Sequence, residues 1–219
     1  MTNISIRKYS EKHRQSVREI CFNTGLGGDS ISPYFDDLDL FADMIILYYT
    51  DYEPQSALVA VHNGQAVGYL LGCADTNTYI KVMRREIAPQ ILTNIVRGKY
   101  NIRRKTRDFL RRYLRDEIPA IFSLPSLDLY PAHLHINLEE GYRRSGAGAR
   151  LMKSFFKYLL ENGIGGVYLG TSSLNTQALP FYKKLGFTMY RRSRTDFWRG
   201  LLDRDVYNII FVKRLCPQT

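Results

Sequence analysis

The sequence has 219 residues, of which 45% are hydrophobic and 24% charged, close to the averages for globular domains and enough for a sizeable core. It contains no run of about eighteen apolar residues, and its first ten residues lack the apolar core of a signal peptide, so we expect neither a membrane span nor secretion. The three cysteines are scattered and lack metal-binding spacing. They predict free thiols, no metal site and a cytoplasmic or nuclear protein.

The net charge of +10 is concentrated in one segment. Residues 81–115 contain twelve of the 31 basic residues and two of the 21 acidic ones, so the rest of the chain is neutral. A basic cluster attracts anionic partners, but aromatic residues are sparse here and no nucleic-acid motif is present. We expect this segment to help capture an acidic acceptor or partner, and we do not expect it to bind nucleic acid.

The first half of the chain predicts strands and helices in alternation. Residues 4–9 alternate apolar and polar side chains, as a half-buried strand does, and Ser10 is a typical N-cap for a helix over 11–23. A loop rich in Gly, Ser and Pro follows, and then a second helix over 38–50. The stretch SALVAVHNGQAVGYLLGCA predicts a hairpin, because Asn-Gly between two β-rich runs is a preferred turn.

The second half begins with the basic segment and ends in alternating elements. Residues 77–96 and 106–122 predict helices that are interrupted at Pro89 and Gly98 and stop near Pro119. The remaining patterns predict strands over 133–138, 165–171, 188–193 and 207–215 and helices over 148–161 and 175–186. The order of elements indicates an α/β (mixed α+β) fold, with parallel strands at the sheet centre where strands and helices alternate.

A short motif precedes the helix at 148–161. Arg143, Gly146 and Gly148 form an R-x-x-G-x-G pattern between a predicted strand and a predicted helix. Glycine costs about 1 kcal/mol relative to alanine inside a helix, so both glycines need a compensating reason. A helix N-terminus offers free N–H groups to a phosphate, and the alternative reason is close packing of the backbone.

A second motif follows about 25 residues later. In SSLNTQALPFYKKLGF, Asn175 begins a helix, Ala178 is a small residue on it, and Tyr182 lies within Phe-Tyr-x-x-x-Gly-Phe. The two motifs in this order resemble the GCN5-related N-acetyltransferase (GNAT) superfamily. Over AHLHINLEEGYRRSGAGARLMKSF and GVYLGTSSLNTQALPFYKKLGF, the chain looks most like the acetyltransferase-like domain of O-GlcNAc hydrolases and its free-standing relatives.

The resemblance implies a fold and a cofactor. The fold would be a single domain over residues 1–219, with a central mixed sheet of about seven strands flanked by helices and a helical basic insertion at about 76–128. The cofactor would be acetyl-CoA (coenzyme A), with its pantetheine arm beside the end of the HLHINL strand and its pyrophosphate on the glycine loop. The implied cofactor-binding residues are Leu138, Arg143, Arg144, Ser145, Gly146, Ala147, Gly148, Ala149, Asn175, Ala178 and Tyr182.

The resemblance also implies catalytic roles, and it leaves the general base open. Tyr182 would be the general acid for the leaving thiolate. Asn137 stands where relatives often carry an acid, and an amide cannot accept a proton at neutral pH. His133, His135 and Asp75 therefore remain as candidate bases, and a histidine base would make the rate rise with pH between about 6 and 8.

Two functions fit these residues. The first is an acetyl-CoA-dependent N-acetyltransferase in which the amine of a small molecule or peptide attacks the thioester directly. The second is a non-catalytic acyl-CoA-binding module of the same fold that acts through partners. The identity of the acceptor and the oligomeric state leave no signal in the sequence.

Overall fold

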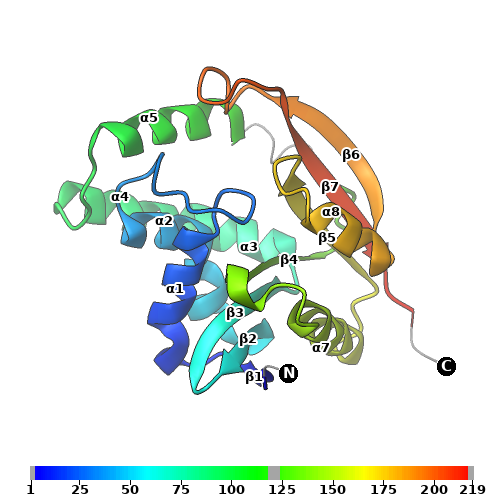
Figure 1. The fold of residues 1–219 in the computed structure, drawn as a ribbon. Helices are drawn as coiled ribbons and strands as arrows, with labels where there is room; N and C mark the ends of the chain where they lie inside the picture. The colour runs from blue at the N-terminus through cyan, green and yellow to red at the C-terminus, as the bar shows by residue number, and fades with distance from the viewer. Residues whose placement is uncertain (1–2, 118–123, 217–219) are drawn as a thin grey trace.

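The computed structural model describes residues 3–117 and 124–216, and its backbone is organised around one sheet (Figure 1). The seven strands lie in the order β1-β2-β3-β4-β5-β7-β6, and only the central pair, β4 and β5, is parallel. The predicted mixed sheet with a parallel centre is therefore confirmed. The strand bounds are β1 Ser5–Lys8, β2 Ala57–His62, β3 Gln65–Cys73, β4 Ala132–Leu138, β5 Gly166–Ser172, β6 Thr188–Thr195 and β7 Val206–Arg214.

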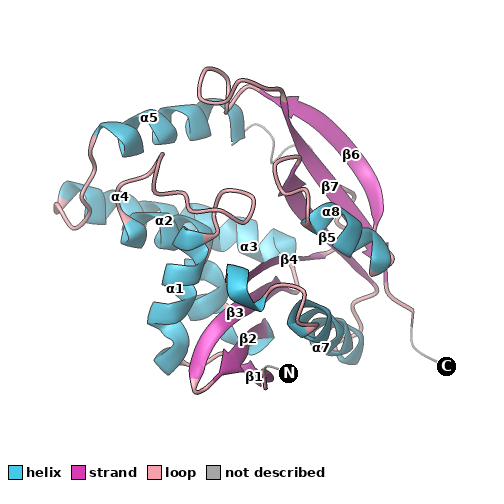
Figure 2. Ribbon diagram, viewed as in Figure 1, coloured by secondary structure: helices cyan, strands magenta, loops and turns pink. Residues whose placement is uncertain are grey.

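Helices lie on both sides of this sheet, as Figure 2 shows, because both of its faces are apolar. One face carries α1 and α2 over a core that includes Tyr49 and Tyr69, and the other carries α7 over a core that includes Phe155. Gly72 of β3 makes room for α7, since a Cβ at this position would lie 2.0 Å from the Phe155 ring. The helix bounds are α1 Arg14–Asn23, α2 Leu38–Ile45, α3 Thr76–Val82, α4 Ala88–Val96, α5 Arg104–Arg112, α7 Ala147–Glu161 and α8 Ala178–Lys184.

Several helices are shorter or more irregular than predicted. The helix predicted over 38–50 ends at Ile45 and is followed by a π-helical turn at Tyr48–Tyr52. The helix predicted over 175–186 is limited to Ala178–Lys184, with the Asn175 side chain accepting a hydrogen bond from the Ala178 N–H at 3.2 Å. The N-cap position itself is Gln177, and Asn175 accepts this bond from the turn that precedes the helix.

The basic segment forms helices between β3 and β4. The chain stays helical through Pro89, because a π-helical turn at Met83–Ile87 joins α3 to α4 and places the proline in the first turn of α4. After α5, a further π-helical turn covers Tyr113–Glu117, and the predicted stop near Pro119 lies outside the described residues. Within the described residues, no helix is long and apolar enough to cross a membrane.

Candidate functional site

The two central strands separate along their length. β4 and β5 pair only at Ala132–Val167 and His133–Tyr168. From Leu134 and Leu169 onward their facing edges are not paired with each other, although β4 continues to Leu138. Strands β5 to β7 accordingly run away from β1 to β4 in Figure 2. An unpaired strand edge offers N–H and C=O groups to an extended ligand.

A loop of free N–H groups lies where β4 ends and α7 begins. Arg144 and Gly146 have positive φ angles of 60° and 82°, which turn the backbone back on itself. The Ser145 hydroxyl accepts a hydrogen bond from the Ala147 N–H at 3.3 Å. Within this loop, the backbone N–H groups of Arg144, Ser145, Gly146, Gly148 and Ala149 have no hydrogen-bond partner among the described residues. Clustered N–H groups at a helix N-terminus form a site for an anion, so these residues fit a pyrophosphate.

The two glycines of this loop serve different purposes. Gly146 adopts a left-handed conformation with open space around it, so it permits the turn and leaves room for a ligand. Gly148 lies in the first turn of α7, and a Cβ there would approach Leu138 and Phe181 to 3.3 Å. Close packing therefore explains Gly148, and backbone conformation explains Gly146.

The side chain of Arg143 ties this loop to a distant segment. Its guanidinium donates to the Leu138 carbonyl oxygen at 3.1 Å and to the Gly28 carbonyl oxygen. Gly27 packs beside Asn175, where a Cβ would lie 3.2 Å from the Asn175 nitrogen. The loop before α2 thus joins the ends of β4 and β5, although the sequence indicated only a glycine-rich loop there. Three glycines within GLGG are the signal for this close backbone approach.

Tyr182 occupies the α7 side of the sheet. It is buried on α8 among Phe181, Phe187 and Phe211, and its hydroxyl has no hydrogen-bond partner among the described residues. Burial raises the pKa of Tyr182, so the phenol keeps its proton at neutral pH. The position is compatible with a donor to a ligand atom. Ala178 begins the same helix and is half-buried.

His133 belongs to a buried hydrogen-bond network. Its Nε2 lies 2.8 Å from the Tyr49 hydroxyl, and its Nδ1 lies 2.8 Å from Thr76 Oγ1. Thr76 donates its own proton to the Pro131 carbonyl, so His133 donates from Nδ1 and accepts from Tyr49 at Nε2. Burial lowers the pKa of His133 to about 3. Both ring nitrogens are occupied, so we revise the expectation that His133 acts as a base.

His135 and Asn137 follow on the same face of β4. His135 is half-buried, its ring packs edge-on against Tyr49 at 5.3 Å, and neither ring nitrogen has a hydrogen-bond partner within the described residues. Burial lowers the pKa of His135 to about 4, so the imidazole is neutral at pH 7. Asn137 donates from Nδ2 to the Tyr69 hydroxyl at 2.8 Å. Of the two histidines on this face, His135 is therefore the one with nitrogens available to a ligand.

Asp75 is the N-cap of α3 and lies near the start of β4, whereas the loop of free N–H groups follows the end of that strand. Its carboxylate accepts hydrogen bonds from the Asn77 N–H at 2.9 Å and from the Thr78 hydroxyl at 2.7 Å. The next residue, Thr76, bonds to Pro131 at the start of β4, whereas the N–H loop follows the end of that strand. Both carboxylate oxygens of Asp75 thus take part in capping α3, at the end of β4 that is remote from the loop. We therefore do not retain Asp75 as a candidate base.

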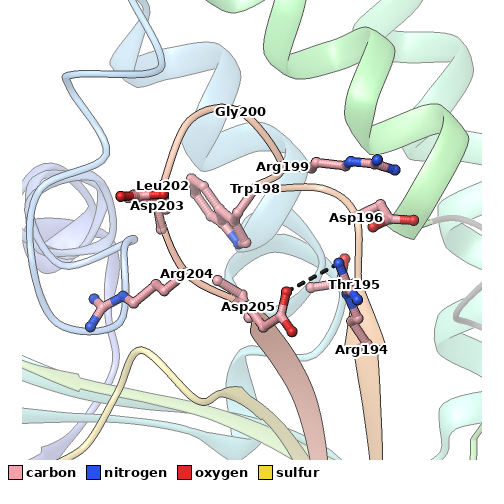
Figure 3. Close-up of a pocket in the computed structure, with 11 residues that line it drawn as sticks. Arg194, Thr195, Asp196, Trp198, Arg199, Gly200, Leu202, Asp203, Arg204 and Asp205 are labelled. Carbon is pink, nitrogen blue, oxygen red and sulfur yellow. Dashed lines mark ion pairs between the residues drawn. The ribbon is translucent and has the colours of Figure 1, made fainter.

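Two hollows lie beside β6 and β7. The loop joining β6 to β7 borders a polar space of about 250 Å³, which is lined by Trp198, Arg194 and the ion-pair partner of Arg194, Asp205 (Figure 3). A second space, of about 240 Å³, is lined by Arg115, Asp116, Arg194 and Asn208 among others. Asn208 pairs with Ser172 at the end of β5, so the second space adjoins the separated strands.

Comparisons with known proteins agree with this geometry. Residues 126–187 match the model of the Acetyltransferase (GNAT) family, a span that contains β4, the N–H loop, β5 and α8. A crystal structure of a protein termed SsHAT superposes with a TM-score of 0.74 at 29% identity, covering 97% of this chain and 98% of that one.

More distant structures share the fold. The protein yncA from Salmonella typhimurium, in a structure with its cofactor acetyl-CoA, gives a TM-score of 0.59 at 15% identity, with 100% of this chain and 97% of that chain covered. A variant of agmatine N-acetyltransferase in its apo form gives 0.61 at 15% identity, with 97% and 100% covered.

Proposed function

We propose that this chain, whose residues 126–187 match the GNAT acetyltransferase family, uses acetyl-CoA as its cofactor and transfers the acetyl group to an amine by direct attack. The observation that carries the proposal is that β4 separates from β5 and that unpartnered backbone N–H groups lie in the loop after the end of β4. An extended ligand with a phosphate at one end matches such a site, because the strand edge pairs with its arm and the helix N-terminus holds its charge.

The chain's own residues divide the work of binding. The N–H groups of Arg144, Ser145, Gly146, Gly148 and Ala149 would hold the pyrophosphate, and Ala147 completes the turn. The end of β4 at Leu138 would lie along the pantetheine arm. Asn175 and Ala178 would contact the arm from the start of α8. Arg143 would position the loop rather than bind phosphate, because its guanidinium is already hydrogen-bonded to the carbonyl oxygens of Leu138 and Gly28.

Proton transfer would involve two side chains on opposite faces of the sheet. Acetyl-CoA supplies the thioester when it is bound. His135 would accept the proton of the amine, directly or through water, because its ring nitrogens have no hydrogen-bond partner in the described chain and burial leaves the imidazole neutral, although the same burial weakens it as a base. Tyr182 would donate its hydroxyl proton where the thiolate leaves, since burial keeps the phenol protonated.

Two measurements on the same preparation test the proposal. Calorimetry with acetyl-CoA should give one site with a dissociation constant in the micromolar range, about −8 kcal/mol. Thiol release with a panel of amines, including peptides with a free N-terminus or lysine, should exceed the rate without amine. Binding without amine-dependent thiol release from any member would contradict transfer and favour the alternative of a non-catalytic acyl-CoA-binding module. Absence of binding would contradict both.

A further inference from the structure

Only one face of α5 packs against the rest of the described protein. Phe109 is buried on that face and contacts the rings of Phe35 and Phe197 edge-on at 5.1 and 4.9 Å. Thr106 is also buried there and donates from its hydroxyl to Asp36 at 3.1 Å. Lys105 points the same way, with its ammonium 3.7 Å from Asp36. These contacts attach the helix to the rest of the protein.

The opposite face of α5 carries a basic stripe, which we define as Arg104, Arg107 and Arg111. Their spacing of three and four residues places them on one side of the helix. The side chains of Arg104 and Arg111 are 92% and 77% exposed, and Arg107 is exposed too. The acid between them, Asp108, lies 3.8 Å from Arg104 and 3.4 Å from Arg111. One carboxylate charge is thus set against the three guanidinium charges of the stripe. Like charges at this spacing destabilise a helix, and none of the three packs into the core, so folding does not explain the stripe.

The C-terminal end of the stripe lies near the end of β5, where β4 and β5 are separated. Arg112 donates to the carbonyl oxygens of Phe197 and Arg199 at 3.1 and 2.8 Å, which fastens the end of α5 to the β6–β7 loop. Figure 1 shows α5 meeting this loop above the sheet. The next turn places Arg115 at the polar space of about 240 Å³, and Asn208 on the wall of that space pairs with the end of β5. A chain bound along the stripe would therefore approach the end of β5, where β4 and β5 are no longer paired with each other.

We propose that the basic stripe docks an acidic peptide segment whose own amine is the acetyl acceptor, an inference that rests on the proposed transfer to an amine. Arginine binds carboxylates through two parallel hydrogen bonds, which favours aspartate and glutamate side chains as the ligand. A nucleic acid fits less well, because the aromatic residues of this helix, Phe109 and Tyr113, are turned inward or half-buried and offer no stacking platform. A membrane surface fits less well, because Leu114 alone is a large apolar side chain exposed on this helix and its following turn.

The test measures docking separately from catalysis. The probe is a fluorescein-labelled peptide with a single lysine flanked by glutamates, and its control replaces every glutamate with glutamine. Anisotropy is recorded for the parent and for the triple variant Arg104→Gln, Arg107→Gln, Arg111→Gln. A matched triple, Arg84→Gln, Arg85→Gln, Arg97→Gln, removes the same charge from exposed positions on and beside α3 and α4. Acetyl-CoA affinity and thiol release are measured on all three proteins.

The proposal expects a selective loss. At about 50 mM salt, the stripe variant should bind the acidic peptide at least about 10-fold more weakly, the matched triple should change little, and the difference should shrink as salt rises. Acetyl-CoA affinity should be the same in all three proteins. Among these peptides, the acidic one should also be the better acceptor for the parent.

Three results would overturn the proposal. Equal peptide affinity in the parent and the stripe variant at low salt would show that these arginines do not dock it. Equal affinity for the glutamine peptide would show that acidity is not recognised. Displacement of the peptide by lower concentrations of a single-stranded oligonucleotide or of phosphatidylserine vesicles would assign the stripe to another polyanion. Stripe-dependent peptide binding without thiol release would instead leave the docking in place and contradict the proposed transfer.

Discussion

Tyr182 is the residue at which acid catalysis can be separated from packing. Its ring is held by Phe181, Phe187 and Phe211, none of which requires the hydroxyl. Tyr182→Phe should therefore fold normally and bind acetyl-CoA with nearly unchanged affinity, while turnover falls by about 10²-fold because the leaving thiolate loses its proton donor. Calorimetry and thiol release on the two proteins check this. Equal turnover would assign the tyrosine to the core alone.

If His135 is the base, the rate should depend on pH differently than it does for an ordinary histidine base. Because its pKa is lowered to about 4, the imidazole is already neutral above pH 5 and its titration cannot produce a rise in rate between pH 6 and 8. This replaces the expectation from the sequence. His135→Gln should lower kcat/KM by about 10²-fold, by the same factor at every pH from about 5.5 to 8.

Asp75 provides the matched control for that experiment. Asp75→Asn keeps an oxygen that can cap α3, so the variant should be stable and as active as the parent. A large loss of kcat/KM in a folded Asp75→Asn protein, or a normal rate in His135→Gln, would show that the base has been assigned to the wrong side chain.

At the scale of elements, the N-terminus of α7 is the part of the fold that would hold phosphate. Gly146→Asp adds both a side chain at a φ angle of 82° and a negative charge beside the free N–H groups. Gly146→Asn adds a side chain of the same shape without charge, and asparagine tolerates this conformation better than most residues. The aspartate variant should lose about 10-fold or more in acetyl-CoA affinity relative to the asparagine variant, as calorimetry would show. Equal affinities would mean that the phosphates lie elsewhere.

At the scale of the whole molecule, the His133 network joins three segments, namely the turn after α2, the start of α3 and β4. The pKa of His133 is about 3 in the folded protein and about 6.5 in an unfolded chain, so between these values the unfolded state binds more protons. Stability should be full above about pH 6.5 and decline as the pH falls toward 3, by about 1.4 kcal/mol for each pH unit from this residue.

Chemical denaturation at several pH values measures this effect. His133→Gln should be less stable than the parent at pH 7.5, because a buried network is disturbed, yet its stability should depend less on pH between about 6.5 and 4. Parallel dependence in the two proteins would place the acid sensitivity in other groups.

The sequence by itself predicted the strands, the positions of most helices and the motif on which the resemblance to the GNAT superfamily rests. Hydrophobic periodicity, the Asn-Gly turn and the R-x-x-G-x-G pattern are local signals, and the sheet, α7 and the loop before it follow from them. The finer resemblance to the domain that accompanies O-GlcNAc hydrolases stays a prediction.

The tertiary structure alone decided which side chains are available for chemistry. His133 and His135 are equivalent in the sequence pattern, but Tyr49 and Thr76 reach His133 from segments 84 and 57 residues away and leave His135 without a partner in the described chain. The Arg143 guanidinium donates to the carbonyl oxygen of Gly28, 115 residues distant. Lys105 lies 3.7 Å from Asp36, whereas the side chain of Arg104 is 92% exposed. Local pattern fixes the direction of a side chain relative to its own helix or strand. Burial, partners and pKa depend on which distant segments pack against it, because desolvation and hydrogen bonding are properties of the assembled core.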